Sequence, residues 1–553
     1  MGTPPEAMSV PEAFADALGR HRVGDYDGAA ALYQQILLAE PNNAGVHYNL
    51  GITYRQVGRL DEAVEENARA LALKPDFPEA ENNLGILLRS LWRIDEGVEA
   101  FQRAVALKPD FAEAWNNLGV TLRNLGRMDD AVGCFERSIE LQPHNASLHS
   151  NYLHALHYQP GRDPVALKDE HRRWSERHAD ALEPLLPEHS NERSPGRRLR
   201  IGYVSACFRE HCQSFFTVPL LSHHDHERFE IYCYSDTEHR DALTARLETF
   251  ADAWRTVAGR SDGQVAQAVL DDRIDILVDL MLHTSGNRLL AFARRPAPIQ
   301  VTWLGYPGST GLSAVDYRFT DPWLDPPGGN DELYSERSFR LADSFWCYDP
   351  LAAGPAVDVP PSLRAGYVTF GCLNNFSKVN DPLLDVWARV LRAVPDSRLL
   401  LLAPRGEARR RVMRRLDVSQ ERVEFADFEP RQRYLETYRR IDLCLDTFPY
   451  NGHTTSLDAF WLGVPVVSLC GQTPVSRAGL SQASNLGLPG LVARDAGEFV
   501  RIAAEWAGDP RRLAAIRSTM RARMEKSPLM DGRLFARSVE NAYRTLWHEW
   551  CAG

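Results

Sequence analysis

The residues with the clearest chemical potential lie between positions 448 and 458, where a strand is predicted to lead into a helix. The apolar run Ile441–Leu445 predicts a buried strand before this stretch, and Ala459–Gly463 predicts a helix that ends at a glycine. Backbone N–H groups at the start of such a helix, together with the positive end of its dipole, suit a phosphate group. The pattern therefore predicts an anion-binding turn.

Polar side chains stand at this predicted helix start, namely His453, Thr454, Thr455 and then Asp458. The two hydroxyls and the imidazole can donate hydrogen bonds to phosphate oxygens. A structural role is compatible with this one. In that role Thr454 or Thr455 is the N-cap and Asp458 is the acidic residue of a capping box.

Further polar residues follow other predicted strands of the second half of the chain. Lys378 and Arg431 each come shortly after a strand, as do His211 and His283. Taken singly, such residues are typical of surface charges or of hydrogen-bonded structural histidines. Because the carboxyl ends of parallel strands meet at one edge of a sheet, Lys378, Arg431 and the His453 turn together predict a diphosphate site.

Short apolar strands alternate with helices from Arg198 onwards, which predicts mostly parallel sheets covered by helices. A new series starts at Tyr367, so we expect two doubly wound α/β lobes with a ligand cleft between the carboxyl ends of their strands. The predicted strands are 199–205, 229–234, 274–280 and 299–304 in the first lobe, and 367–371, 398–402, 423–425, 441–445 and 464–469 in the second.

No spacing typical of a metal site is found in the sequence. The Asp-x-Asp pair at Asp25 and Asp27 lies far from these strands, and no His/Cys cluster has ligand spacing. We therefore expect no metal and no cofactor, with the charge of a leaving diphosphate neutralised by Lys378, Arg431 and backbone N–H groups.

The first part of the chain is a repeat array. Prolines recur 34 residues apart, and the best copy fits the tetratricopeptide consensus from Trp115 to Pro143. Small residues let two antiparallel helices approach, and the proline ends the second helix. The sequence predicts an α-solenoid of about four to five repeats over residues 11–160.

One asparagine per repeat keeps the same period, at Asn49, Asn83, Asn117 and Asn151. Each asparagine either bonds a neighbouring turn or belongs to a ladder of amides that grips the backbone of an extended peptide. Because asparagine is a poor helix former, its regular recurrence favours the peptide ladder.

Composition narrows the class of protein. The 553 residues carry a net charge of −11, which does not favour binding to nucleic acid or to an anionic membrane. No apolar run approaches the length of a membrane span, and the N-terminus lacks the features of a secretory signal. The nine cysteines have no paired spacing, so we expect reduced thiols and a cytoplasmic protein.

Two long motifs carry a family resemblance. The repeats followed by Arg294–Gly308 (RRPAPIQVTWLGYPG) and by Cys444–Asp458 (CLDTFPYNGHTTSLD) resemble the O-linked N-acetylglucosamine transferases of glycosyltransferase family 41, which have the plant SPINDLY-type proteins as relatives. The resemblance covers nearly the whole chain and is closest to the compact bacterial form. It implies the GT-B architecture of two Rossmann-like lobes, and an inverting, metal-independent transfer of a sugar from a nucleotide diphosphate to Ser or Thr of proteins.

The resemblance also implies residue roles. Lys378 matches the lysine that stabilises the leaving diphosphate, and Asp458 matches an acid that binds the nucleotide ribose. The implied phosphate-binding residues are His453, Thr454 and Thr455, with Asn375 where the animal enzymes have a glutamine. Arg431 and Tyr434 stand near the position of the base, and Leu304 and Gly305 match the wall of the sugar pocket.

Three positions depart from the family pattern. Cys207 replaces the usual aspartate of the first motif, Leu282 replaces the usual glycine before His283, and Asp275 replaces a second candidate histidine. His211 matches a histidine on the acceptor side that has been considered as the base, and His283 belongs to the predicted substrate-binding set. The base is thus either His211 or the leaving phosphate itself.

The predicted function is transfer of N-acetylglucosamine (GlcNAc) from UDP-GlcNAc to proteins held by the repeat groove. The alternatives are fucosyl transfer from GDP-fucose and a catalytically silent tetratricopeptide adaptor, and the repeats leave open whether the protein is a homodimer.

The predicted organisation is the array (11–160), a connecting helix or linker (161–197), an N-terminal lobe (198–352), a nucleotide-sugar-binding C-terminal lobe (353–526) and a C-terminal helix (527–553).

Overall fold

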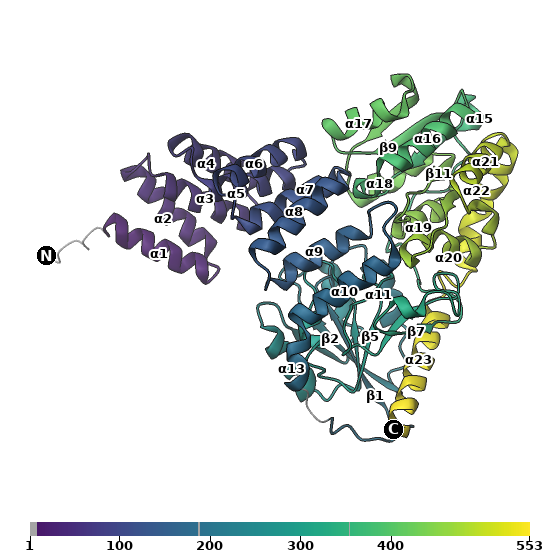
Figure 1. Ribbon diagram of the computed structural model, residues 1–553, viewed down its shortest axis with the longest axis horizontal. Helices are drawn as coiled ribbons and strands as arrows, with labels where there is room; N and C mark the ends of the chain where they lie inside the picture. Colours follow the sequence, from purple (N-terminus) through teal and green to yellow (C-terminus); the bar gives the residue numbers. More distant parts are fainter. Residues whose placement is uncertain (1–7, 186–188, 353) are drawn as a thin grey trace. The chain divides into compact units, whose positions relative to one another are not determined.

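The computed structural model describes residues 8–185, 189–352 and 354–553 (Figure 1). The chain forms two compact units. The repeat unit holds the residues up to 143 together with 404–408, and the α/β unit holds 144–403 and 409–553. The predicted bounds of the five segments stay predictions.

The repeat unit consists of helices that pair in antiparallel fashion along the chain, as the tetratricopeptide pattern predicts. Small residues make the close approach possible: a Cβ atom at Gly85 would lie 2.7 Å from the ring of Phe101, and one at Gly119 would lie 2.9 Å from the ring of Phe135. The helices are α1 (Val10–Arg22), α2 (Tyr26–Ala39), α3 (Ala44–Gln56), α4 (Leu60–Leu73), α5 (Pro78–Ser90), α6 (Ile94–Leu107), α7 (Ala112–Asn124) and α8 (Met128–Leu141).

The first sheet of the α/β unit is parallel throughout and has the strand order β3-β2-β1-β4-β5-β6-β7. This is the doubly wound order, in which the direction of winding reverses between β1 and β4. The strands are β1 (Leu199–Ser205), β2 (Phe229–Ser235), β3 (Ala253–Thr256), β4 (Ile276–Asp279), β5 (Ile299–Thr302), β6 (Tyr317–Thr320) and β7 (Arg337–Arg340).

The second sheet repeats this arrangement, with the order β10-β9-β8-β11-β12-β13 and a reversal between β8 and β11. The chain thus folds as helical repeats followed by two Rossmann-like lobes, as predicted. The strands are β8 (Thr369–Cys372), β9 (Arg398–Leu402), β10 (Val423–Ala426), β11 (Leu443–Leu445), β12 (Val466–Leu469) and β13 (Val492–Ala493).

The helices that follow the repeat unit begin with α9 (Ala146–Leu156) and α10 (Pro164–His178). The remaining helices are α11 (Ser214–Leu221), α12 (Ala242–Glu248), α13 (Asp262–Asp271), α14 (Leu289–Phe292), α15 (Ser362–Ala365), α16 (Asp381–Ala393), α17 (Glu407–Leu416), α18 (Arg431–Thr437), α19 (Thr454–Trp461), α20 (Ala478–Asn485), α21 (Ala496–Ala507), α22 (Pro510–Glu525) and α23 (Gly532–Ala552).

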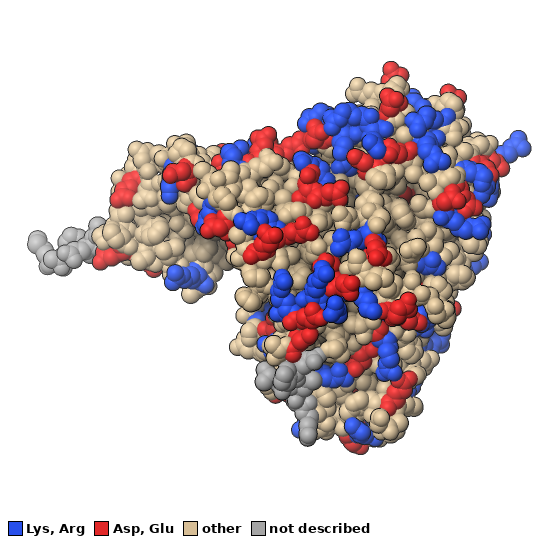
Figure 2. Space-filling view, viewed as in Figure 1, with Lys and Arg blue, Asp and Glu red and all other residues tan. Residues whose placement is uncertain are grey.

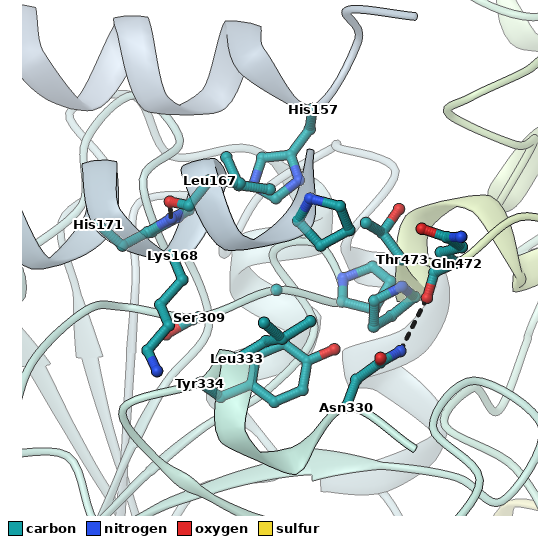
Figure 3. Close-up of a pocket in the computed structure, with 14 residues that line it drawn as sticks. His157, Leu167, Lys168, His171, Ser309, Asn330, Leu333, Tyr334, Gln472 and Thr473 are labelled. Carbon is teal, nitrogen blue, oxygen red and sulfur yellow. Dashed lines mark hydrogen bonds between the residues drawn. The ribbon is translucent and has the colours of Figure 1, made fainter. Parts of the chain in front are cut away.

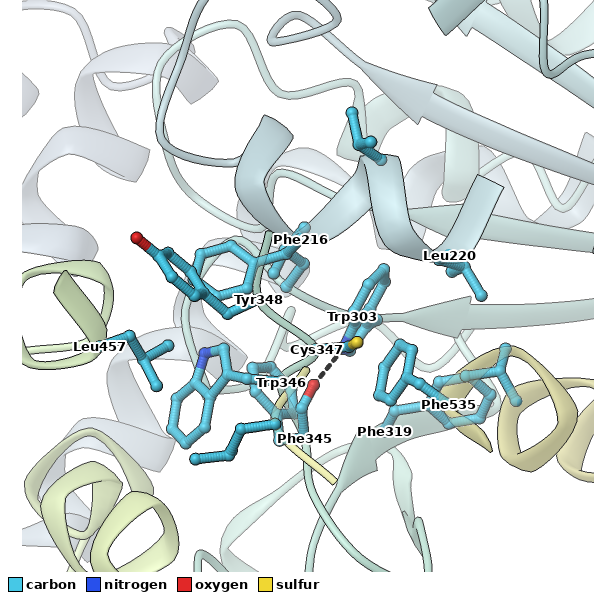
Figure 4. Packing of buried hydrophobic residues seen from close by; sticks show 14 of the residues in the cluster. Phe216, Leu220, Trp303, Phe319, Phe345, Trp346, Cys347, Tyr348, Leu457 and Phe535 are labelled. Atoms are coloured by element: carbon cyan, nitrogen blue, oxygen red, sulfur yellow. Dashed lines mark hydrogen bonds between the residues drawn. The ribbon is translucent and has the colours of Figure 1, made fainter. Parts of the chain in front are cut away.

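The C-terminal helix α23 packs against the first sheet rather than the second (Figure 1). The ring of Phe535 lies 5.6 Å from that of Trp303, and the Tyr543 hydroxyl is 3.0 Å from the hydroxyl of Tyr203 on β1. Figure 4 shows this core, in which the indole N–H of Trp303 donates to the carbonyl oxygen of Phe345 at 3.0 Å. The two lobes therefore share one hydrophobic core, which holds their strand ends in place.

Charged side chains of both signs are interspersed on the face shown in Figure 2. A dense group of basic residues lies over α17, where Arg409, Arg411 and Arg415 form ion pairs with Asp427, Asp381 and Asp385. These basic residues are thus largely neutralised in place. Among the described residues, no helix combines the length and hydropathy of a membrane span.

Candidate functional site

The predicted site residues follow the strands at both points where the winding reverses. His211 and His283 follow β1 and β4, whereas Lys378 and His453 follow β8 and β11. In open α/β sheets, ligands bind outside the carboxyl ends of the strands at these points. The topology thus places the candidate residues where a ligand is expected.

A tight turn joins β11 to α19 and is built around buried Asp446. Its carboxylate accepts hydrogen bonds from the backbone N–H of Gly452 at 2.6 Å and from the Ser468 hydroxyl at 2.6 Å. Only glycine fits at position 452, because a Cβ atom there would lie 2.2 Å from the Ser456 hydroxyl oxygen and 3.0 Å from Asp446 Oδ1. This turn fixes where α19 begins.

The start of α19 carries no side-chain cap. His453 occupies the N-cap position and makes no cap hydrogen bond, and the first turn holds no acidic residue. The alternative of a Thr454 or Thr455 cap with Asp458 in a capping box is therefore wrong. Among the described residues, the His453 Nε2 atom is buried without a partner, and burial together with the Lys378 charge keeps the pKa of the imidazole well below its usual range. A backbone hydrogen bond with Val475 uses one proton of the ring. The uncapped helix start is thus the group at this turn that is open to an anion.

Lys378 lies next to this turn. Its ammonium donates to the backbone carbonyl of Asn451 at 2.7 Å and lies 4.2 Å from the centre of the Tyr450 ring. Burial lowers the pKa of Lys378 to about 8, and the nearby Asp446 carboxylate partly offsets this effect. An ammonium this poorly solvated gains strongly from a new anionic partner.

Arg431 and Asp458 form a bidentate ion pair, with both contacts at 2.6 Å. The Asp458 side chain is only 1% exposed. Tyr348, from the segment that leaves the first lobe, donates its hydroxyl to Asp458 at 2.5 Å, and the Arg431 guanidinium lies 4.4 Å from the centre of the Phe215 ring. The pair therefore ties α18 and α19 to the first lobe.

Other predicted site residues are arranged around these groups. Asn375 is exposed, and its side chain accepts from the Ser377 N–H at 3.0 Å. The Tyr434 hydroxyl is 2.7 Å from that of Tyr438, and the Thr455 hydroxyl donates to Asn374. Asn375 is thus open to a ligand, whereas the Tyr434 and Thr455 hydroxyls already have protein partners.

The wall predicted for a sugar pocket is held in an unusual backbone conformation. Leu304 has φ 80° and Leu282 has φ 48°, both in the left-handed region that favours glycine. A Cβ atom at Gly305 would lie 2.6 Å from the backbone oxygen of Met281. The segments after β4 and β5 therefore pack backbone against backbone, which explains why position 305 requires glycine.

His211 lies on the loop between β1 and α11. Its Nδ1 accepts the backbone N–H of Gln213 at 3.2 Å, and burial together with the Arg209 charge lowers the pKa of the imidazole to about 4. Burial raises the pKa of the adjacent Cys212 thiol. The nearby Lys378 charge lowers this pKa, and the Asp458 charge raises it. The loop thus faces both the Lys378 and the Arg431 groups, and the imidazole is neutral at pH 7.

His283 has a structural environment. It is fully buried, its Nδ1 lies 3.0 Å from the Ser150 hydroxyl, and its Nε2 lies 2.9 Å from the Thr310 carbonyl oxygen. Both ring nitrogens are therefore used, and none is left for a substrate in this conformation. Asp275 also has a structural partner, because it pairs with Arg197 at 2.5 Å.

Several residues of the site escaped the sequence analysis. Asp446 and Asn451 lie inside the Cys444–Asp458 motif, but nothing in their spacing indicates their function. Asp446 supports the turn, and the Asn451 carbonyl accepts from Lys378. Tyr348 and Phe215 come from the first lobe, and no motif or spacing around them in the sequence indicates that they belong to the site. Their contacts with the Arg431–Asp458 pair depend on tertiary packing alone.

The repeat asparagines are engaged within the protein. Asn83 is 4% exposed, donates to Asn67 Oδ1 at 3.0 Å and accepts from the Arg55 guanidinium at 2.9 Å. Asn117 donates to Asn82 at 3.0 Å, and Asn49 donates to the carbonyl of Gly45 on its own helix at 2.8 Å. For Asn83 the structure favours the internal role, and the peptide ladder stays a prediction.

We expect Asn83→Ala to destabilise the repeat unit by about 1–3 kcal/mol, because it leaves the buried Asn67 Oδ1 without its donor and the Arg55 guanidinium without its acceptor. Urea unfolding monitored by circular dichroism measures the change. Asn49→Ala is the matched control and should shift stability by less than about 0.5 kcal/mol, since its amide bonds only its own helix. Equal effects of the two substitutions would contradict the internal role.

Two histidines of the α/β unit should make it sensitive to acid. His149 Nδ1 lies 3.0 Å from His178 Nε2, and burial lowers their pKa values from 6.5 to about 3 and about 4. The unfolded chain therefore binds more protons than the folded one below pH 6.5. Stability is full above this pH and falls as the pH drops towards the folded pKa values, by about 1.4 kcal/mol per pH unit for buried His149.

Unfolding free energies measured between pH 7 and pH 4.5 check this expectation, and the His149→Gln/His178→Gln double variant should show a shallower slope. Replacement of the exposed His239 by Gln is the control and should leave the slope unchanged. A double variant with the slope of the unmodified protein would show that these two rings do not titrate with unfolding.

Known proteins match most of this chain. The family model described as Glycosyl transferase family 41 matches residues 177–352 and 362–539, and tetratricopeptide repeat models match residues 21–83 and 112–145. A solved structure of a mutant O-GlcNAc transferase from Thermobaculum terrenum is 38% identical, covers 92% of this chain and 98% of that chain, and superposes with a TM-score of 0.84.

Curated plant proteins are also similar. The probable UDP-N-acetylglucosamine–peptide N-acetylglucosaminyltransferase SPINDLY of Solanum lycopersicum is 37% identical over 414 residues, 73% of this chain. The SEC protein of Arabidopsis thaliana, which carries the same activity in its name, is 31% identical over 374 residues, 65% of this chain. The chain spans 44% of the length of the first and 38% of the second. With the family model matched across both lobes and the strand-end residues in place, the chain belongs to glycosyltransferase family 41.

Proposed function

We propose that this chain transfers GlcNAc from UDP-GlcNAc to Ser and Thr hydroxyls of proteins, with inversion and without a metal ion. The observation that carries the proposal is the desolvated ammonium of Lys378 beside the uncapped start of α19. Positive charge and N–H donors that lack solvent stabilise a leaving diphosphate far better than they would in water. The names of the similar proteins support the donor and the acceptor class.

In the proposed reaction the acceptor oxygen attacks the anomeric carbon while the bond from that carbon to the diphosphate oxygen breaks. A single displacement of this kind inverts the anomeric centre. Lys378 and the first turn of α19 hold the departing diphosphate. The hydroxyl proton passes to neutral His211 or to the leaving phosphate. Because the pKa of His211 is about 4, its imidazole is a weak base, and the phosphate can compete with it for the proton.

Arg431 and Asp458 would hold the nucleoside. The Asp458 carboxylate accepts two bonds from Arg431 and one from Tyr348, and its side chain is 1% exposed, so a ribose hydroxyl would bind it by taking the place of one of these donors. The planar Arg431 guanidinium, next to Tyr434, offers a face on which a base can stack. Arg431 and Tyr434 are also the positions at which the chain departs from the animal enzymes, so they bear on the choice of UDP or GDP.

Two further aspects belong to the proposal. Among the described residues, no three His, Cys, Asp or Glu side chains are grouped to hold a metal ion, which supports charge neutralisation by Lys378 and backbone N–H groups instead. The cysteines are all free, from Cys134 to Cys551, which supports a reducing compartment such as the cytoplasm. The repeat unit would present the protein acceptor.

The test is a transfer assay on the full chain with UDP-GlcNAc and a library of Ser/Thr peptides, with and without EDTA. We expect release of UDP and addition of one N-acetylhexosamine per modified peptide, both unchanged by EDTA. Consumption of GDP-fucose instead would replace the donor in the proposal. Binding of a donor with neither hydrolysis nor transfer would favour the silent adaptor.

A further inference from the structure

Cationic side chains that lack a carboxylate partner indicate where an anionic ligand can supply the missing charge. In the α/β unit, Lys168 is the only lysine or arginine among the described residues that line the pocket beside α10 (Figure 3), and its ammonium already donates to the Glu332 carbonyl at 2.5 Å. The repeat unit offers a stronger candidate. Arginine recurs every 34 residues in the last turn of α3, α5 and α7, at Arg55, Arg89 and Arg123, and we call this set the arginine column.

The arginine column lies on a face that the first helices of three consecutive repeats share. Helices α3, α5 and α7 contact one another directly, and one side of each packs on the second helix of its own repeat. The arginines are half-buried on another side, which apolar residues three positions earlier extend towards the middle of each helix. These apolar residues, also half-buried, are Ile52, Ile86 and Val120.

A second set of arginines with the same period shows what an ordinary surface column is like. Each of these arginines donates at 2.6–2.7 Å to a carboxylate three residues later on its own helix. The pairs are Arg59 with Glu62, Arg93 with Glu96, and Arg127 with Asp130.

The arginine column differs, because within the described part of the chain Arg55 and Arg89 form no ion pair with a carboxylate. Their hydrogen bonds go to neutral oxygens instead: Arg55 donates to Asn83 Oδ1 at 2.9 Å, and Arg89 to the Asn117 carbonyl oxygen at 3.5 Å. Among the described residues, none of their other N–H groups is buried without a partner, so these groups stay accessible to solvent. They are therefore available to a ligand.

The arginines of the column also act on one another. Burial, and then the charges of Arg123 and Arg55, lower the pKa of Arg89 to about 10, and burial lowers the pKa of Arg55. Like charges that are partly desolvated and lack a counter-ion cost stability. An anionic ligand would remove this cost, and groups perturbed in this way are frequent at functional sites.

The surroundings of the column favour a polypeptide as the anion. A guanidinium binds a carboxylate through two parallel hydrogen bonds, and the adjacent row of isoleucine and valine suits the apolar parts of a peptide. The carboxylates in the first turns of α5 and α7 are at the other end of these helices and already accept from Lys108 and Gln142. The net charge of −11 does not favour nucleic acid.

We propose that the arginine column binds an extended acidic segment of a polypeptide, with an Asp or Glu carboxylate at about every third residue. Neighbouring helices pack roughly 8–10 Å apart, and an extended chain covers about 3.3 Å per residue, so this spacing brings one carboxylate to each arginine. The inference rests on the proposed function in that it names the class of acceptor, proteins with an acidic segment. The binding itself does not require transfer.

Binding is measured on the full chain, without a nucleotide sugar, by the fluorescence anisotropy of a labelled peptide. The peptide has Glu at every third residue, contains no Ser or Thr, and is compared with a matched peptide in which Gln replaces each Glu. We expect the Glu peptide to bind at least about tenfold more tightly, because its carboxylates form charge-assisted hydrogen bonds. Added salt should weaken the Glu peptide and leave the Gln peptide nearly unchanged.

The Arg55→Gln/Arg89→Gln variant should bind the Glu peptide at least about tenfold more weakly than the unmodified chain does. Arg59→Gln/Arg93→Gln is the matched control with the same change of charge, and it should keep the affinity within about twofold because these arginines already have partners. Circular dichroism of both variants checks that they are folded. The comparison of Glu and Gln peptides on the unmodified chain tests the inference without any variant.

A transfer assay with UDP-GlcNAc and a Ser-containing version of the Glu peptide separates this inference from the proposed function. The Arg55→Gln/Arg89→Gln variant should have at least about a fivefold higher KM for this peptide than the control variant. Absence of transfer to any peptide would remove the proposed function and leave the binding result intact. The inference is overturned if the Glu and Gln peptides bind equally, if the two variants bind the Glu peptide equally, or if single-stranded oligouridylate binds more tightly than the Glu peptide.

Discussion

Replacement of Lys378 by alanine is expected to lower turnover by at least about 10²–10³-fold while the protein stays folded. The ammonium is held 2.7 Å from the Asn451 carbonyl, beside the helix start that would receive the diphosphate. Its interaction with the diphosphate grows as the negative charge develops, so its loss should act mainly on the rate of the chemical step. Burial already disfavours the charged form, as the lowered pKa shows, so removing the side chain should not unfold the chain.

Steady-state release of UDP measures this effect, and Lys526→Ala on the exposed end of α22 is the matched control with unchanged turnover. The pH profile adds a second readout. Because the pKa of Lys378 is about 8, kcat/KM should fall as the pH rises through this value and the ammonium loses its proton. Lys378→Arg should remove this alkaline limb. Near-normal turnover in Lys378→Ala would refute the diphosphate assignment.

Replacement of Arg431 by methionine is expected to destabilise the α/β unit by about 3–5 kcal/mol. The substitution leaves the Asp458 carboxylate, 1% exposed, without its bidentate partner. It also removes the guanidinium from the Phe215 ring of the first lobe, 4.4 Å away. Methionine keeps much of the apolar contact, so the loss measured is mainly that of the buried charge pair.

Urea unfolding measures this change, and Arg433→Met provides a control on the same helix. Arg433 is 74% exposed and lies 3.7 Å from Glu429, so its replacement should change stability by less than about 1 kcal/mol. Adding Asp458→Asn to Arg431→Met should restore part of the lost stability, because no unpaired charge then remains buried. If Arg431→Met and Arg433→Met unfold at the same urea concentration, the pair does not hold the lobes.

Much of the architecture could be read from local patterns. Fully buried parallel strands appear as continuous apolar runs, so β1 and β9 were predicted with their observed bounds and most other central strands within a few residues. The strands β3, β6, β7 and β13 were not predicted. Edge strand β7 has the sequence Arg-Ser-Phe-Arg, which is not an apolar run. Strand β6 contains Arg318, whose buried guanidinium pairs with Asp325 at 2.7 Å and donates to the Gly308 carbonyl at 2.9 Å.

The sequence indicates which residues belong to the site better than it indicates how these residues contact one another. Lys378, Arg431 and the His453 turn were found because each follows a strand, and topology brings strand ends together. The Arg431–Asp458 pair was not found, since it depends on how α18 and α19 are rotated against each other. The packing of α23 on the first lobe likewise leaves no trace in its own sequence, because an amphipathic helix fits either lobe.

The most direct test of the nucleotide site is calorimetric binding of UDP and GDP to the full chain, with and without EDTA. We expect saturable binding that favours UDP, is unchanged by EDTA and is weakened by Lys378→Ala. A ligand that binds only the folded state should also raise the unfolding temperature in proportion. Preference for GDP would change the donor, whereas no binding of either nucleotide would contradict the assignment of the strand-end residues to a nucleotide-sugar site.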